Sequence, residues 1–285
     1  MKFPRTKRWP WLVLLAAGLG LITASVAFAE QRSPEAEAAR FLSSYENVSF
    51  RARDGTKLAG WFVPCVNAKR AAVLLHGNGL RRTQMLARAR LLHDNGYAVL
   101  LYDARGHGES EDKHVSYGWF ETSDLLGALD WLHNQGFIEF GCLGASQGGA
   151  TIVLAAAQLK DVRWVVLESV YPMLQLAVDR RFRHSAGAPG WLAGRLLTPL
   201  AEWWTGTSFD KISPVEHIAE LNCPVLIMGG DQDNYVQPSD TQELFARARE
   251  PKSFWLVPGA AHVDLYGFAK QDYERHLLSF IATTN

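Results

Sequence analysis

Hydrophobic residues along the chain gather in short runs, and longer segments with apolar positions at helical spacing lie between them. Six of these runs predict buried strands, at residues 71–75, 98–102, 138–143, 162–167, 225–228 and 254–257. Five segments predict helices, at residues 81–95, 120–134, 147–159, 239–249 and 267–281. An alternating stretch at 47–64, with Asp54-Gly55 at its turn, predicts a β-hairpin. This alternation predicts an α/β fold with a doubly wound, mostly parallel sheet covered by helices on both faces.

One segment interrupts the alternation. Between residues 169 and 218 no strand pattern occurs, yet the segment is rich in leucine and tryptophan, including Trp191, Trp203 and Trp204. Long loops without secondary structure are uncommon in compact domains, so we expect a helical insertion at about 170–218. After a strand of a doubly wound sheet, such a cap would lie above the crevice that binds ligands. We expect most of its aromatic side chains to pack the cap onto the body.

The N-terminus has the pattern of a targeting segment. Four basic residues precede an uncharged run at residues 11–29, which ends in Ala27-Phe28-Ala29. This pattern predicts a signal peptide at 1–29, although the run is also close to the minimum length of a membrane anchor. In both cases the folded body is exported, either as a periplasmic or secreted protein or attached to the membrane. Residues 30–44 then form a linker or short helix, and 45–285 form one domain.

Composition narrows the range of partners. The chain has 285 residues, 29 basic and 29 acidic, and therefore no net charge that would favour nucleic acid. Its three cysteines are too few for a disulfide framework. No spacing of cysteine and histidine suggests a metal site.

The residues Gly144-Ala145-Ser146-Gln147-Gly148 follow one predicted strand directly and begin a predicted helix. A Gly-x-Ser-x-Gly sequence in this context is typical of a nucleophile elbow, a sharp turn with strained backbone that lifts the serine hydroxyl above the sheet. Gly144 and Gly148 are expected because side chains there would clash within the turn. The alternative is a plain strand–helix turn with a capping serine.

A serine hydroxyl needs a base to remove its proton, and that base needs a third group to orient it. His262 follows the last predicted strand, in a loop of small residues. The other histidines after Ser146 lie in the insertion or inside the last helix. The acid is expected after the preceding strand, where Asp231 and Asp233 are both candidates.

Two further runs follow predicted strands. His76-Gly77-Asn78-Gly79 comes after the first, at a place where such a loop supplies a backbone N–H to an oxyanion. We therefore expect the oxyanion to be held by the backbone amides of Asn78 and Gln147, the second at a helix N-terminus. The run at 103–110, Asp-Ala-Arg-Gly-His-Gly-Glu-Ser, is expected to shape the rim of the site, with no catalytic role for His107.

Taken together, HGNG, DARGHGES, GASQGG, GDQD and GAAH resemble the α/β-hydrolase superfamily, in its monoacylglycerol-lipase-like and serine-aminopeptidase-like branch. The resemblance covers about residues 47–281. The spacing Gly230-x-x-Asp-x-x-Val236 matches the usual acid of this fold, which favours Asp233 and leaves Asp231 as a turn residue. The resemblance implies a catalytic triad of Ser146, Asp233 and His262, without metal or organic cofactor.

The same resemblance implies hydrolysis of an ester through an acyl-enzyme. Serine at the elbow argues against the branches of the superfamily that have aspartate or cysteine there. The apolar cap favours a small or lipid-like ester, and the N-terminal segment allows contact with a membrane. Other functions remain open on the same fold. A serine aminopeptidase would need an acid such as Glu168 or Asp179 to hold a substrate amine, and Arg180, Arg181 and Arg183 could hold an anion. An acyltransferase differs only in its acceptor, and a non-catalytic binding protein is the remaining alternative.

Overall fold

A computed structural model describes residues 33–112 and 114–284. The expected signal peptide or anchor, residues 1–29, lies outside the described residues. Within the described part, no helix is both long and apolar enough to cross a bilayer. The expected linker contains one short helix, α2 (Pro34–Ala38), whose first turn is capped by the side chain of Ser33.

Eight strands form one sheet, in the order β1-β2-β4-β3-β5-β6-β7-β8. Their bounds are β1 Glu46–Arg51, β2 Lys57–Val63, β3 Arg70–Leu75, β4 Ala98–Tyr102, β5 Glu139–Ala145, β6 Val162–Glu168, β7 Val225–Gly230 and β8 Lys252–Val257. β1 and β2 form the expected hairpin, and β2 pairs antiparallel with β4. The six strands from β3 to β8 run parallel to one another. The central parallel strands are covered on both faces, which is why their sequences are continuously apolar rather than alternating.

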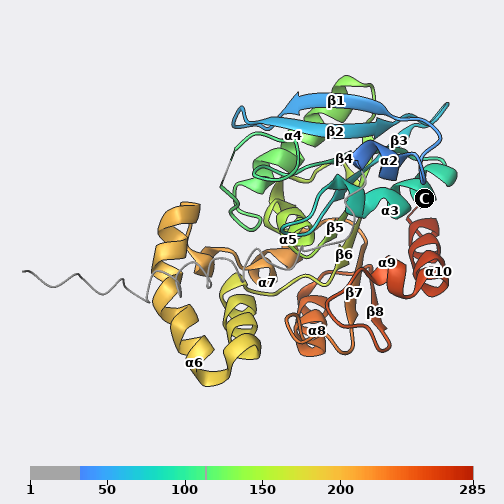
Figure 1. Cartoon of the computed structure of the whole chain (residues 1–285). Coiled ribbons are helices and arrows are strands. Elements are labelled where there is room, and N and C mark those ends of the chain that lie inside the picture. The colour runs from blue at the N-terminus through green and yellow to red at the C-terminus, as the bar shows by residue number, and fades with distance from the viewer. Residues whose placement is uncertain (1–32, 113, 285) are drawn as a thin grey trace, which may run out of the picture.

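Helices cover both faces of this sheet (Figure 1). On one face, α4 (Glu121–Asn134), α5 (Gln147–Leu154) and α8 (Pro238–Arg247) share one hydrophobic core with the odd-numbered side chains of β3. On the other face, α2, α3 (Leu86–Asp94) and α10 (Lys270–Ala282) share a second core with the even-numbered ones. The predicted doubly wound α/β fold is therefore confirmed.

Three predicted helices are shorter than expected, and the one predicted at 147–159 ends as α5 at Leu154. The first begins with a 3-10 turn, η1 (Arg82–Met85), before α3. The last is divided into α9 (Leu265–Phe268) and α10, because Ala269 between them has non-helical φ and ψ of −131° and 50°. Asp264 caps α9 by accepting a hydrogen bond from the backbone of Gly267 at 3.0 Å.

The strand order reverses beside β3, since β4 lies on one side of it and β5 on the other. Leu75 at the end of β3 is paired with Gly144 near the end of β5. In open α/β sheets, the crevice outside the carboxyl ends of the strands at such a reversal is where ligands bind. The loops that follow β3, β5, β7 and β8 all emerge at this edge.

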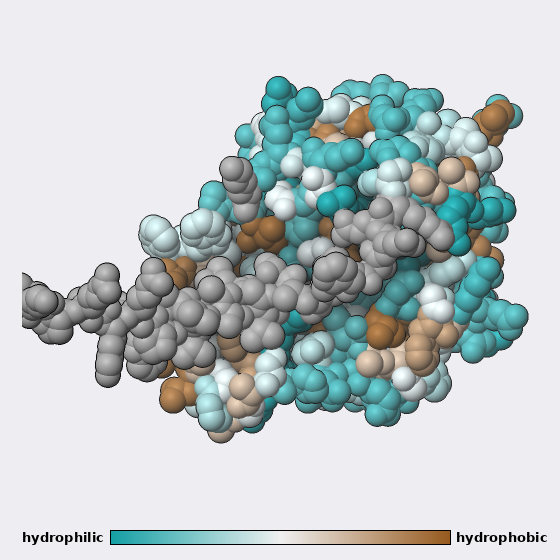
Figure 2. All heavy atoms as spheres, viewed as in Figure 1, coloured by the Kyte–Doolittle hydropathy of each residue, from teal (hydrophilic) through white to brown (hydrophobic). Residues whose placement is uncertain are grey.

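A long helical segment, α6 (Leu174–Thr205), lies between β6 and β7, where the sequence predicts an insertion. It is interrupted by non-helical backbone at Ala186 and Gly187, and its two arms form the yellow V at the lower left of Figure 1. Trp203 and Trp204 on the second arm are 76% and 57% exposed, and the ring of Trp204 contacts His114 of the body with centroids 5.5 Å apart. Figure 2 shows hydrophobic side chains in brown on this part of the surface.

The remaining elements are short. Between α6 and β7 follow η3 (Phe209–Lys211), α7 (Pro214–His217) and η4 (Ile218–Glu220), and η2 (Ala156–Gln158) follows α5.

Candidate active site

Ser146 lies in the sharp turn between β5 and α5. Its backbone has φ 49° and ψ −113°, a conformation that costs a residue with a side chain about 1–3 kcal/mol and persists only where the surroundings impose it. Two backbone hydrogen bonds do so here: Ser146 donates to the carbonyl of Glu168 at 2.7 Å and accepts from Ala150 at 2.9 Å. The side chain remains partly exposed at the carboxyl edge of the sheet.

The glycines of this turn allow its close approach to β3. A Cβ atom on Gly148 would lie 2.4 Å from the carbonyl oxygen of Leu75, and one on Gly144 would lie 2.5 Å from the backbone of Gly148. Neither distance leaves room for a side chain. The structure thus shows the steric requirement that the Gly-x-Ser-x-Gly spacing predicts.

Asp233 and His262 meet at the same edge, from the loops after β7 and β8. The ring Nδ1 of His262 lies 2.7 Å from Oδ2 of Asp233. The other carboxylate oxygen accepts the backbone N–H groups of Tyr235 and Val236 at 2.8 and 2.9 Å, and the side chain is fully buried. An ionised carboxylate is an acceptor only, so this contact assigns the ring proton to Nδ1 and leaves Nε2 as the basic nitrogen.

Asp231, the other candidate for the acid, has a different partner. Its Oδ1 accepts the backbone N–H of Gly259 at 2.6 Å. This hydrogen bond joins the loop after β7 to the loop that carries His262. The structure therefore brings Asp233 to the histidine and gives Asp231 a role in holding the two loops together.

The structure shows no hydrogen bond between Ser146 and His262 within the described residues. Their loops follow β5 and β8, which β6 and β7 separate in the sheet. Hydrogen bonds between catalytic groups are often long before substrate binds, so this arrangement is compatible with a triad.

The two predicted oxyanion donors also lie at this edge. Gln147 is the first residue of α5, so its backbone N–H has no acceptor within the helix. Asn78 lies between two anchored amides: Gly77 donates to Oε1 of Gln84 at 2.8 Å, and Gly79 donates to Nε2 of His107 at 3.0 Å. Neither the Asn78 nor the Gln147 N–H donates to an acceptor among the described residues. Two free N–H donors beside the elbow are what an oxyanion requires.

A buried ionic cluster that was not predicted from the sequence supports the site. Arg88 on α3 makes two hydrogen bonds to Glu168 at 2.8 and 2.6 Å and one to Asp264 at 2.5 Å. The hydroxyl of Tyr273 also donates to Glu168. Because Glu168 accepts the N–H of Ser146 and Asp264 belongs to the loop after β8, this cluster joins the elbow to the histidine loop. The sequence offered one signal of this cluster, because Arg88 is a charged residue among the apolar positions of a predicted helix.

The family model of the prolyl oligopeptidase family matches residues 83–284, about seven tenths of the chain. This chain belongs to the prolyl oligopeptidase family. The segment that matches the family contains Ser146, Asp233 and His262 and begins after Asn78.

Curated relatives from bacteria share this sequence at moderate identity. An uncharacterized Bacillus subtilis protein, YqkD, is 27% identical over 241 residues, which cover 81% of this chain and 77% of YqkD. An uncharacterized Mycobacterium tuberculosis protein is 29% identical over 236 residues, with 81% and 77% covered. These relatives therefore match across most of the domain.

Solved structures share the fold. The Pyrococcus furiosus esterase Pf2001 superposes with a TM-score of 0.74 at 22% identity, over 91% of this chain and 97% of the esterase. An esterase from Exiguobacterium antarcticum superposes with a TM-score of 0.62 at 17% identity, over 83% and 100%. The fold is thus that of the α/β-hydrolase superfamily, as the sequence motifs predict. Within the prolyl oligopeptidase family, this chain is a serine hydrolase of the α/β type.

Proposed function

We propose that the chain cleaves carboxylic esters through an acyl-enzyme, with Ser146 as nucleophile, His262 as general base and Asp233 as the acid that orients it. The observation that carries the proposal is the 2.7 Å hydrogen bond between Asp233 and His262 at the edge where Ser146 is held in strained backbone. A serine, a base and an orienting acid are the three parts that nucleophilic catalysis at a hydroxyl needs.

The reaction would proceed in two steps. In the first, Oγ of Ser146 attacks the ester carbonyl while Nε2 of His262 takes its proton, and the tetrahedral oxyanion is held by the N–H groups of Asn78 and Gln147. Protonation of the leaving alkoxide by His262 releases the alcohol and leaves the acyl group on Ser146. In the second step, His262 takes a proton from water, the resulting attack releases the carboxylic acid, and the serine regains its proton. Asp233 stabilises the imidazolium in both steps.

The surface of the cap supports an ester with an apolar acyl chain. The second arm of α6 carries an exposed apolar stripe formed by Leu192, Leu196, Leu200 and Trp203. An exposed stripe of this kind suits apolar ligands better than charged ones. Two of the solved structures with this fold are named esterases, which agrees with an ester as the substrate.

The acids considered for an aminopeptidase are engaged elsewhere. Glu168 is buried in its ion pair with Arg88. Asp179 accepts from Gln175 at 2.7 Å and is paired with Arg195 at 2.9 Å. A free amine needs an uncompensated carboxylate, and neither of these offers one.

Peptide hydrolysis is the second candidate function, because the family match is to prolyl oligopeptidases. The same triad and oxyanion donors would act on an amide, and only the binding surface would differ. The two candidates therefore have to be separated by substrate rather than by mechanism.

The test compares kcat/KM of the purified full-length chain on two substrate series. One series contains nitrophenyl esters of butyrate and octanoate, and the other contains aminoacyl and prolyl nitroanilides. The proposal predicts turnover of the esters, loss of that turnover in Ser146→Ala, and no turnover of the anilides above the Ser146→Ala background. A larger kcat/KM on a prolyl or aminoacyl anilide than on either ester would overturn the ester proposal in favour of a peptidase.

A further inference from the structure

The loop that supplies the Asn78 amide is held by the run at 103–110, to which no catalytic step assigns a role. Gly79 donates its N–H to Nε2 of His107 at 3.0 Å, although 28 residues separate them. On the other side of Asn78, the Gly77 N–H is held by Gln84. Glycine on both sides gives this loop an unusual range of backbone conformations, and the φ of Gly79 is +71°. Its conformation therefore depends on these two anchors.

His107 can accept this hydrogen bond only in one protonation state. Its Nδ1 lies 2.9 Å from the carbonyl oxygen of Arg105, which is an acceptor, so Nδ1 carries the proton. The lone pair of Nε2 is then available to the N–H of Gly79. Since the side chain is buried, no solvent replaces either partner. His107 is thus a neutral link between two loops.

His76 makes a second link of the same kind. Its Nδ1 lies 2.8 Å from the carbonyl oxygen of Gly77, and its Nε2 accepts the N–H of Ala104 at 3.0 Å. Burial, together with the neighbouring ring of His107, lowers the pKa of His76 to about 4. The two rings pack edge to face, with centroids 5.0 Å apart. The two loops are therefore joined in both directions by neutral imidazoles.

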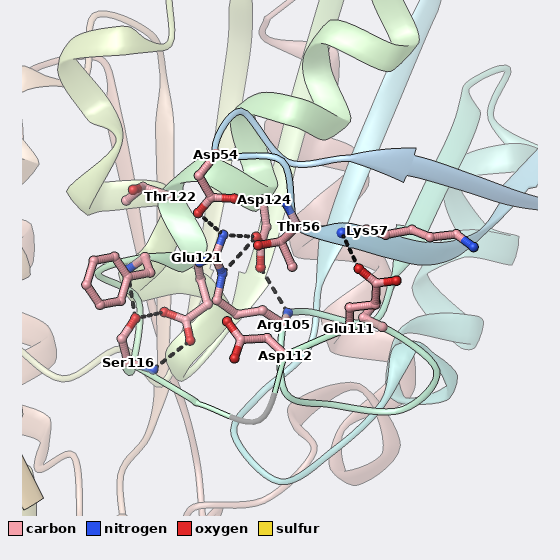
Figure 3. A network of polar contacts seen from close by, with 12 residues as sticks. Asp54, Thr56, Lys57, Arg105, Glu111, Asp112, Ser116, Glu121, Thr122 and Asp124 are labelled. Carbon is pink, nitrogen blue, oxygen red and sulfur yellow. Dashed lines mark hydrogen bonds and ion pairs between the residues drawn. The ribbon is translucent and has the colours of Figure 1, made fainter. Parts of the chain in front are cut away.

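A buried ion pair fixes the far end of this link. Arg105 donates to Asp124 through its backbone N–H at 2.9 Å and through its guanidinium at 3.0 and 2.7 Å. The guanidinium also donates to Asp54 at 2.6 Å. Figure 3 shows Arg105 between these two carboxylates, beside the start of α4. The carbonyl that orients the ring of His107 thus belongs to a residue whose backbone and side chain are both held.

We propose that His107 is a positioning residue for the oxyanion hole. Its neutral ring connects the buried Arg105–Asp124 pair to the N–H of Gly79 and so keeps the adjacent amide of Asn78 aimed at the oxyanion. This inference rests on the proposed function, because it matters only where an oxyanion forms. Donors stabilise a transition state most when their orientation is fixed in advance, and complete loss of one costs about 10²–10³ in kcat. Loosening the loop rather than deleting the donor should cost about 10- to 100-fold in kcat.

The decisive comparison is between two amide side chains at the same position. In His107→Gln, the oxygen reaches the position of Nε2 and can accept from Gly79, while the donor to Arg105 is lost. In His107→Asn, the amide nitrogen can donate to Arg105, but no atom reaches Gly79. The two variants are polar and smaller than histidine, and each keeps one of its two hydrogen bonds, so the comparison separates the bond to Gly79 from the bond to Arg105. His133→Ala, at a partly exposed position on α4, serves as the control for loss of a histidine.

The measurements are kcat and KM on nitrophenyl butyrate, and inhibition by a trifluoromethyl ketone. With this inhibitor, Ser146 forms a hemiketal whose oxygen occupies the oxyanion hole, so affinity reports on that hole directly. We expect His107→Asn to lower kcat and inhibitor affinity together by about 10- to 100-fold, with KM within about threefold. We expect His107→Gln to restore most of both, and His133→Ala to match wild type.

Three results would overturn the proposal: unchanged kcat in folded His107→Asn, a loss of kcat with unchanged inhibitor affinity, or equal losses in the Asn and Gln variants. Should His107→Asn not fold, an inhibitor affinity of His107→Gln more than about tenfold below wild type would also overturn it. Turnover that persists in Ser146→Ala would instead defeat the proposed function, so the two failures are distinguishable.

Discussion

Replacing Asp233 with asparagine preserves the size of the side chain and removes the charge that faces His262. One carboxylate oxygen accepts two backbone N–H groups, from Tyr235 and Val236, so the amide oxygen should keep that position. The amide nitrogen then faces His262, and as a donor it requires the lone pair of Nδ1. The ring proton moves to Nε2, which can no longer act as a base. In a triad of serine, histidine and aspartate, replacing the aspartate with asparagine lowers kcat by about 10⁴-fold, so we expect Asp233→Asn to lose about 5 kcal/mol of transition-state stabilisation.

The assay is kcat on nitrophenyl butyrate for Asp233→Asn and for the matched variant Asp231→Asn. The oxygen of an asparagine at position 231 can still accept the N–H of Gly259, so we expect kcat within about threefold of wild type. Circular dichroism and thermal unfolding establish that both variants are folded. Equal losses in the two variants, or a larger loss in Asp231→Asn, would refute the assignment of the acid.

Three further predictions concern stability. Gly148→Ala places a Cβ atom 2.4 Å from the carbonyl of Leu75 and should lower the free energy of unfolding by at least about 2 kcal/mol in urea; unchanged stability would contradict the packing described for the elbow. His76 is neutral when folded and has an ordinary pKa when unfolded, so stability should fall as pH drops from 6.5 to about 4, by about 3 kcal/mol in total. In urea unfolding between pH 4 and 7.5, His76→Gln should lack this pH-dependent loss of stability. The same pH dependence in the variant and the wild type would contradict the assignment to His76. Arg88→Met leaves Glu168 buried without its cation and should cost about 3–5 kcal/mol in chemical denaturation, whereas a loss below about 1 kcal/mol would show that the pair is not needed.

Much of the fold could be predicted from local pattern. The central strands β3 and β4 are buried on both faces, so they appear in the sequence as nearly uninterrupted apolar runs. The elbow could be recognised because its glycines and Ser146 are adjacent in the chain. The interruption at Ala269 is different, because helical apolar spacing continues across a single non-helical residue.

The parts that could not be predicted depend on contacts between distant segments. Arg88 and Glu168 are 80 residues apart, and no local pattern connects them. Asp231 and Asp233 follow the same strand, and only the fold shows which of them faces His262. Likewise, His107 gains its role from Gly79, which comes from a neighbouring loop.

Labelling of the nucleophile tests the central claim most directly. The full-length chain is treated with a fluorophosphonate, digested, and analysed by mass spectrometry, beside Ser146→Ala. The account predicts one phosphonylated site, at Ser146, and neither labelling nor ester hydrolysis in the alanine variant. A label on another residue, or hydrolysis that survives in Ser146→Ala, would contradict the assignment of Ser146 as the nucleophile.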